Sequence, residues 1–338
     1  MLKVIIKVLE KIKSFFKENW KFIIFLVVFY LFMNYQLPYS IYTPGGAINM
    51  SDRVSGENTY KEEGSLSMTY VSMVKGSIPF IGLSYIIPNW DLVPTDDITY
   101  DDASLKETVE IDKIYMKEAI SNAEGVAYKT ANIDYKIKST KNVITYISSD
   151  AKTHLRYGDE LTRVDGMEVK SIKDLQEYIK TKSVGDKINI DYIRDNKENT
   201  DEVTLIDMNG EVKAGLSMAL INEYDTPYNI EVKTKSSESG PSGGLITALE
   251  IYNRITEEDI TRGMKIMGTG TIESDGTVGE IGGVKYKLIG AVKKGAEVFI
   301  CPEENYKEAA SVAKKNKYNI KIISAKTFEE ALLKLNNL

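Results

Sequence analysis

The sequence of 338 residues contains a single cysteine, Cys301, and a single histidine, His154. One cysteine excludes an intramolecular disulfide and a metal cluster held by several thiolates. One histidine means that any Ser-His-Asp triad, Cys-His pair or two-histidine metal site would have to use His154. Because His154 falls in a segment expected to be an exposed loop, we expect a site that uses neither a histidine base nor a metal.

Two other features are missing from the sequence. The formal net charge is -6, the pI is about 5.2, and no basic stripe with interleaved aromatic residues occurs. Nucleic acid is therefore not an expected partner. The sequence also lacks a G-x-x-x-x-G-K-S/T loop, which excludes a Walker ATPase module in this chain. Any reaction should need neither ATP nor another organic cofactor.

The N-terminal segment has the pattern of a membrane element. Residues 1–19 place apolar side chains on one helical face and lysines elsewhere, which is typical of a basic interfacial helix. The apolar run 22–33, between Trp20 and Tyr35, is shorter than the roughly 20 residues of a spanning helix. We therefore predict a transmembrane signal anchor over 20–40 that includes the flanks of this run. The lysines predict a cytoplasmic N-terminus in a single-pass protein of the cell membrane, with everything that follows outside.

Two alternatives to an anchor follow from the same segment. A cleaved signal peptide would need a small-residue cleavage site, and the region has no clean A-x-A sequence. A buried core helix would leave the polybasic flank without a purpose.

The rest of the chain is long enough for two folded modules. Residues 41–130 show strand-like alternation at 65–74 and helical spacing at 105–123. We expect N-terminal strands and a connector helix there, packed on a later domain. From 131 to 211, short β-rich runs surround one predicted helix at 172–182, so this part should form a small separate module.

Within this module, Gly158-Asp159 and Asp165-Gly166 enclose a short strand in which Leu161 and Val164 suit a core. The order of turn, strand, Asp-Gly and helix resembles the bacterial-type PDZ domain, although Val-Asp-Gly alone is also an ordinary hairpin turn. The resemblance implies that an extended peptide binds as an added strand. The groove strand for that peptide would consist of Val143, Ile144, Thr145, Tyr146 and Ile147.

The last third of the chain contains a glycine-rich turn before an apolar helix. The turn reads Gly240-Pro241-Ser242-Gly243-Gly244 and delivers Ser242 to the start of the helix. A serine there has an exposed hydroxyl, and the nearby backbone N–H groups and the helix dipole can stabilise an oxyanion. Taken alone, however, this turn fits a serine that caps a helix better than it fits a nucleophile.

A second motif provides a candidate base for Ser242. A predicted β-hairpin over 267–281 leads to Gly-Gly-x-x-x-Lys, which ends at Lys287. A lysine with its ordinary pKa near 10.4 is protonated and cannot accept a proton from serine. Burial against apolar neighbours such as Val284 and Leu288 would lower that pKa to about 7 to 8.

Together, Gly-Pro-Ser-Gly-Gly and Gly-Gly-x-x-x-Lys, in which Ser242 and Lys287 are 45 positions apart, resemble the proteolytic domain of the Lon family over 212–338. With the anchor and the PDZ-like module, the chain resembles the membrane-anchored Lon-like peptidases of bacteria with Gram-positive-type envelopes. The resemblance implies that Ser242 is the nucleophile, that Lys287 is the general base and that the Thr269 hydroxyl holds the lysine amine. Gly240, Pro241 and Gly243 would support the nucleophile.

The choice of lysine and two departures from the family pattern bear on this assignment. Lys285 lies two residues before Lys287 and must point to a different helix face, so we expect it to be a solvated surface lysine. Gly243 stands where alanine is usual in the family. Ser239 occupies a position that is often acidic, with Glu238 beside it, which leaves the contribution of an acid open.

The predicted fold class is α+β, with an N-terminal transmembrane helix and a PDZ domain inserted into or preceding a Lon-type proteolytic domain with a mixed sheet. The expected activity is that of an ATP-independent serine endopeptidase, which cleaves peptide or protein segments presented by the PDZ domain outside the membrane. Lon-like domains often form rings, so a homo-oligomer is compatible with this resemblance. The alternatives are a catalytically silent, membrane-tethered PDZ adaptor and a phosphate-binding role for 240–244, although that turn lacks the lysine and βαβ order of such sites.

Overall fold

The computed structural model describes residues 2–100 and 103–338 of the chain. They divide into two compact units. The first unit combines the chain up to Thr43 with Ser72–Ile98, and the second combines Pro44–Val71 with Thr99–Leu338. Each unit is therefore discontinuous in sequence.

The first unit opens with the long helix α1 (Leu2–Asn34), which is followed at once by strand β1 (Gln36–Asn49). Tyr39–Tyr42 of β1 pair with the antiparallel strand β4 (Asp91–Pro94). The predicted span over 20–40 is therefore wrong at its C-terminal end, because the chain becomes extended there to pair with β4. In residues 2–100 and 103–338, no helix is both long and apolar enough to cross a membrane. The unit also contains α2 (Ile78–Ser84) and the 3-10 turn η2 (Thr95–Asp97).

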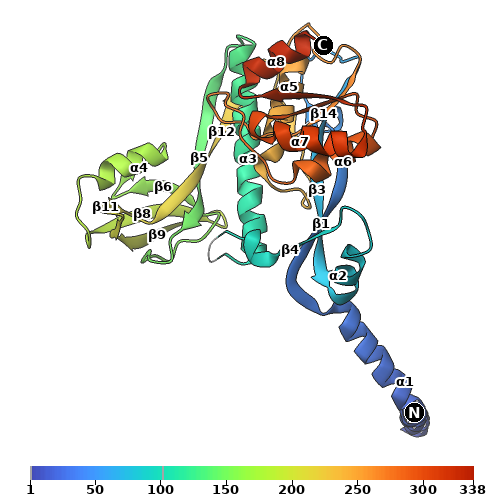
Figure 1. Ribbon diagram of the computed structural model, residues 1–338. Coiled ribbons are helices and arrows are strands. Elements are labelled where there is room, and N and C mark those ends of the chain that lie inside the picture. The colour runs from blue at the N-terminus through green and yellow to red at the C-terminus, as the bar shows by residue number, and fades with distance from the viewer. Residues whose placement is uncertain (1, 101–102) are drawn as a thin grey trace. The chain divides into compact units, whose positions relative to one another are not determined.

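A parallel sheet forms the centre of the second unit, with strand order β16-β15-β14-β3. Figure 1 labels β14 and β3 of this sheet. Ser65 at the start of β3 pairs with Lys265 at the start of β14, 200 positions later, and the pairing continues to Met68 and Gly268. A strand that precedes the PDZ-like module therefore completes the sheet of the C-terminal domain. The strands are β3 (Ser65–Ser77), β14 (Lys265–Gly268), β15 (Val298–Pro302) and β16 (Lys321–Ala325).

Side chains alternate between the two faces of this sheet, and helices cover both faces. Ile266 and Ile300 belong to a core cluster shared with α3 (Leu105–Thr130), α5 (Gly244–Ile255) and α8 (Phe328–Asn336). Met267 and Phe299 belong to a second cluster shared with α6 (Val284–Lys293) and α7 (Glu303–Asn316). The turn that carries Ser242 leads into α5 and Lys287 lies in α6, so the two residues come from helices on opposite faces of the sheet.

Two predicted elements of this unit differ from the structure. The connector helix predicted over 105–123 extends to Thr130, and it begins with a capping box formed by Ser104 and Glu107. The hairpin predicted over 267–281 is mostly a loop, because β14 ends at Gly268. Two hydrogen bonds of a hairpin are nevertheless present, from the Glu273 N–H to the Thr277 carbonyl at 2.9 Å and from the Thr271 N–H to the Gly279 carbonyl at 3.3 Å.

The PDZ-like module is an antiparallel sheet with strand order β12-β5-β6-β8-β9 and one helix, α4. Its core contains Leu161 and Val164, as predicted, together with Leu175 of α4. β12 pairs with β5 along its whole length, so the predicted module boundary at 211 falls just before a strand that belongs to this sheet. The bounds are β5 (Lys136–Ile147), β6 (Glu160–Val164), α4 (Ile172–Ile179), β8 (Lys187–Arg194), β9 (Lys197–Thr204) and β12 (Leu216–Asp225).

The turns quoted for the PDZ resemblance have clear structural roles. Gly158 and Gly166 both have positive φ, which favours glycine. Asp159 is buried and accepts two hydrogen bonds from the guanidinium of Arg194, so the Gly-Asp pair anchors β8 to the loop before β6. His154 lies on that loop with its side chain 92% exposed, as expected.

Short elements complete the second unit. They are η1 (Met50–Asp52), β2 (Val54–Ser55), β7 (Met167–Glu168), β10 (Ile206–Met208), β11 (Glu211–Lys213), β13 (Glu231–Val232) and η3 (Pro241–Gly243).

Candidate active site

Ser242 lies in the 3-10 turn η3, directly before α5. Gly240 precedes the turn with φ of 93°, a conformation that glycine adopts far more readily than other residues. Its N–H donates to the Asp112 carbonyl of α3 at 2.9 Å, which ties the turn to a neighbouring helix. The sequence Gly-Pro thus sets a sharp entry into α5 that holds Ser242 half-buried at the start of the helix.

The capping alternative for Ser242 does not describe this turn. The N-cap of α5 is Gly243, and no side chain makes a capping hydrogen bond there. The Ser242 carbonyl instead accepts hydrogen bonds from the Gly270 N–H at 2.8 Å and from Thr269 Oγ1 at 2.9 Å. The backbone of Ser242 is therefore fixed against the segment that follows β14.

Lys287 lies in the first part of α6, and its side chain is buried. Its side chain is only 3% exposed, and Val284 and Leu288 beside it are fully buried. Nζ donates to Thr269 Oγ1 at 2.9 Å. Burial lowers the pKa of Lys287 to about 7, because the charged ammonium loses its hydration. A large fraction of this amine is therefore neutral near neutral pH.

Thr269 joins the two predicted reacting residues. Its hydroxyl accepts from Lys287 and donates to the carbonyl of Ser242, and its own N–H donates to the Ile300 carbonyl of β15. Thr269 follows the last residue of β14, at the carboxyl edge of a parallel sheet, where such sheets place their sites. The structure brings Ser242, Thr269 and Lys287 together at this edge.

Lys285 has a different environment from Lys287. It is half-buried, and its Nζ lies 5.2 Å from the ring centroid of Tyr286, the geometry of a cation–π contact. The amine that contacts Thr269 therefore belongs to Lys287.

The presence of glycine at position 243 is explained by the side chain that lies beside it. A Cβ added to Gly243 would lie 2.6 Å from Sδ of Met68, closer than any ordinary contact. Met68 is half-buried, packs on the core cluster that includes α5, and pairs with Gly268 in the sheet. Its side chain therefore fills the space that a methyl group at 243 would need. Met68 could not be placed here from its neighbours in sequence, because only the pairing of β3 with β14 brings it to Gly243.

Glu238, the acid beside Ser239, binds Arg53 and the loop backbone and not the amine of Lys287. Its carboxylate pairs with Arg53 and accepts a hydrogen bond from the N–H of Lys235 at 2.8 Å. The acid thus fixes the loop that leads to Ser242.

The predicted peptide-binding strand, Val143–Ile147, forms the C-terminal part of β5. On one edge of β5, Ile147 to Val143 pair with Leu216 to Ala219 of β12. On the other edge, Asn142 and Val143 pair with β6, and Ile144 exchanges hydrogen bonds with the loop before β6. β12 thus lies along one edge of the predicted strand, and β6 with the loop before it occupies the other edge as far as Ile144.

β12 is the edge strand of this sheet next to β5. Successive residues of a strand direct their N–H groups to alternate sides. The Leu220 N–H donates to Glu118 and the Asn222 N–H to Ser121, both on α3, so these two residues face away from β5. By the same alternation, Leu216 and Met218 also face away from β5. The edge available for a peptide is thus the first part of β12.

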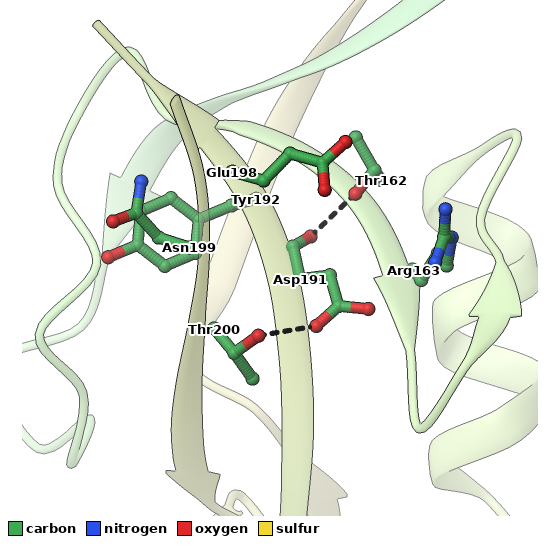
Figure 2. A pocket seen from close by; sticks show the side chains of 7 residues that line it. All are labelled: Thr162, Arg163, Asp191, Tyr192, Glu198, Asn199 and Thr200. Atoms are coloured by element: carbon green, nitrogen blue, oxygen red, sulfur yellow. Dashed lines mark hydrogen bonds between the residues drawn. The ribbon is translucent and has the colours of Figure 1, made fainter. Parts of the chain in front are cut away.

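A polar hollow of about 360 Å³ lies on the same module, along β6, β8 and β9 (Figure 2). Asp191 is one of the residues that line it. The Asp191 carbonyl accepts a hydrogen bond from Thr162 at 3.0 Å, and the Asp191 carboxylate accepts one from Thr200 at 2.7 Å. These groups satisfy one another, and none of the predicted site residues lines the hollow.

Two parts of the chain match known families. Residues 233–336 match the Lon protease (S16) C-terminal proteolytic domain, and residues 132–205 match the PDZ domain. The chain therefore combines a Lon-type proteolytic domain with a PDZ domain in a mixed α/β architecture. The first match supports a serine peptidase.

Individual relatives are similar over the C-terminal domain. The Lon protease of Neorickettsia sennetsu is 33% identical over 97 residues, 29% of this chain and 12% of that protein. The Lon protease of Azorhizobium caulinodans is 34% identical over 121 residues, 36% of this chain and 14% of that protein. The chain thus spans only a small part of the length of these relatives.

A solved structure is similar over the PDZ domain. The PDZ domain of the SdrC-like protein from Listeria monocytogenes is 26% identical, with 25% of this chain and 92% of that chain covered and a TM-score of 0.23.

Proposed function

We propose that this chain is a serine endopeptidase that hydrolyses extended peptide segments without ATP, with Ser242 as nucleophile and Lys287 as general base. The observation that carries the proposal is the buried amine of Lys287, which is bonded to Thr269 Oγ1 at 2.9 Å while Thr269 also binds the backbone of Ser242. A lysine acts as a base only when its pKa falls near the working pH, and burial supplies that shift here.

The proposed reaction has two halves. Ser242 Oγ attacks the carbonyl carbon of the scissile bond while its proton passes to the neutral amine of Lys287. The tetrahedral intermediate collapses as the C–N bond breaks, and Lys287 returns the proton to the leaving amine. Water then attacks the acyl-enzyme and gives a proton to Lys287. As the bond between the acyl carbon and Ser242 Oγ breaks, Lys287 returns that proton to Oγ, and the acid is released.

The turn before α5 can stabilise the charge that develops on the carbonyl oxygen. The first N–H groups of a helix have no partner within the helix, and the helix dipole is positive at this end. The N–H of Gly243 directly follows the nucleophile, which is a common position for an oxyanion donor. Preorganised donors of this type contribute roughly 10²–10³-fold to the rate.

The PDZ domain would present the substrate through β12. Leu216 and Met218 offer outward-facing backbone groups, and their side chains pack on the PDZ core next to that edge. An extended segment could add there as a strand, the binding mode of many peptide-recognition domains. Beyond Met218, Glu118 and Ser121 of α3 occupy the edge, which limits the added strand to its first few residues.

The N-terminal helix would hold the chain at the cell membrane, with its lysine-rich end in the cytoplasm and the peptidase outside. Its apolar side chains are largely exposed, for example Phe25 at 58% and Leu31 at 57%. An exposed apolar surface of this kind favours contact with lipid over water.

The dyad is tested with the full-length chain in mild detergent on an unstructured protein substrate without ATP. Ser242→Ala and Lys287→Ala should each reduce kcat by at least about 10³-fold, because either change removes a group that takes part in bond breaking. The kcat/KM of the wild type should rise with pH through about 7, as Lys287 loses its proton.

Lys285→Ala is the matched control and should keep most of the activity. If Lys285→Ala is inactive and Lys287→Ala is active, the base is wrongly assigned. If the wild type binds peptides but cleaves none, the chain is a tethered adaptor instead.

A further inference from the structure

We infer that Met68 is a specificity-determining residue of the peptidase and forms a wall against the substrate side chain that carries the scissile carbonyl. This inference rests on the proposed function, because it assumes that Ser242 attacks a peptide carbonyl. It concerns a residue on a strand that lies outside both family matches.

The position of Met68 is set by two independent contacts. Its backbone pairs with Gly268, the residue before Thr269, so it lies beside the segment that binds Lys287. Its Sδ lies 2.6 Å from the place of an added Cβ on Gly243, the residue after the nucleophile. The side chain therefore lies on the α5 face of the sheet, against the residue after the nucleophile, on a strand paired with the one that leads to Thr269.

A bound substrate would bring a side chain close to this thioether. If the scissile carbonyl accepts a hydrogen bond from Gly243 N–H, its oxygen lies about 2.9 Å from that nitrogen, and the attached Cα is only about two bonds further. The side chain on that Cα then starts within reach of Met68. Since Met68 is half-buried, part of its surface remains open to such a contact.

The chemistry of methionine indicates which side chains fit. A thioether is apolar, flexible and polarisable, and it forms favourable contacts with aliphatic and aromatic groups but offers nothing to a charge. Its length also limits the space above Gly243. We therefore expect a preference for small or medium apolar side chains on the acyl residue, the substrate residue that carries the scissile carbonyl. A shorter side chain at position 68 would also admit large ones.

The test uses four peptides that differ only in the acyl residue, with Ala, Leu, Phe or Lys at that position. Met68→Ala in the full-length chain should raise the kcat/KM for Phe relative to Ala by about 10-fold or more, the range that pocket volume controls. Met68→Leu nearly conserves the volume and should fold and keep the wild-type order of preference. A structural role alone would change all four values by the same factor.

Met264→Ala is the matched control. Met264 also packs on the core cluster that contains α5, but it precedes the start of β14, at the opposite end of the strand from Thr269. It should change the four values together or not at all.

Gly243→Ala provides a second route to the same result. The new methyl group must displace the flexible end of Met68. Gly243→Ala should therefore alter the order of preference among the four peptides, and adding Met68→Ala should then give the spectrum of Met68→Ala alone.

The outcomes separate this inference from the proposed function. Ser242-dependent cleavage with an unchanged order of preference in Met68→Ala overturns the role of Met68 and leaves the peptidase in place. Absence of Ser242-dependent cleavage in the wild type overturns the proposed function itself.

Discussion

At the scale of single residues, the site depends on the burial of the Lys287 amine, which is unfavourable when the amine is charged. Lys287 is held in an apolar cluster with one hydroxyl partner, Thr269, and this lowers its pKa to about 7. The same burial that makes the amine a usable base also opposes folding when the amine is charged. Reactivity and stability are thus linked through one proton.

The linkage gives a stability prediction with a defined sign. Between pH 7 and the ordinary value near 10.5, the unfolded chain binds the lysine proton and the folded chain does not, so stability rises with pH. Lys287→Met removes this proton and should stabilise the protein at pH 6 by up to about 4 kcal/mol. The gain should shrink toward pH 10, as measured by urea unfolding at several pH values.

Lys285→Met is the control for this experiment. It retains Lys287 and should therefore keep the pH dependence of the wild type. A constant difference between Lys287→Met and the wild type from pH 6 to pH 10 would contradict a depressed lysine pKa.

At the scale of elements, the β5–β12 pair and α3 connect the PDZ domain to the nucleophile. β12 runs beside β5 and then along α3, where Glu118 and Ser121 bind its edge (Figure 1). The same helix binds the Gly240 N–H through the carbonyl of Asp112. One helix therefore contacts both the proposed peptide edge and the turn before Ser242.

The edge assignment predicts the effect of Met218→Pro. Proline removes the outward N–H at this position and is tolerated on edge strands, so pairing with β5 should persist. Affinity for an extended peptide, measured by fluorescence anisotropy, should fall at least about 10-fold. Cleavage of a short peptide that does not reach the PDZ domain should remain close to the wild type. Unchanged affinity in the folded variant would locate peptide binding elsewhere.

Features that depend on residues close in sequence could be predicted, whereas features that depend on distant strands could not. The turn before Ser242 and the helix that carries Lys287 were predictable, because both depend on residues adjacent in sequence. The pairing of Val143–Ile147 with β12 was not, because the two strands exchange hydrogen bonds across about 70 residues of sequence. Met68 was also missed, since local alternation marks it only as a strand residue. An alternation of apolar and polar residues predicts which face of a strand is buried, but it does not identify the neighbouring strand.

At the scale of the whole molecule, the proposal places a peptidase at a membrane through α1. This can be tested by flotation of the full-length chain with vesicles of phosphatidylcholine and an anionic lipid. Phe25→Asp with Phe29→Asp should abolish flotation, because each carboxylate adds roughly 2.5–3.5 kcal/mol to insertion. These two rings stack on the exposed helix surface, with centroids 5.9 Å apart, so no core should be disrupted.

A phenylalanine elsewhere provides the comparison for flotation. Phe80→Asp changes an exposed ring on α2 and leaves α1 intact. Flotation of the Phe25→Asp, Phe29→Asp variant at the wild-type level would exclude α1 as the lipid contact.

The pairing of β3 with β14 also determines when the proposed site can assemble during synthesis of the chain. Ser65 leaves the ribosome 200 residues before its partner Lys265, a delay of roughly 10 to 40 s at ordinary rates of translation. During this interval the PDZ domain can fold, while β3 has no parallel neighbour and Met68 no nucleophile beside it. Because Thr269 and Lys287 emerge later still, the proposed dyad cannot assemble until Lys287 has left the ribosome.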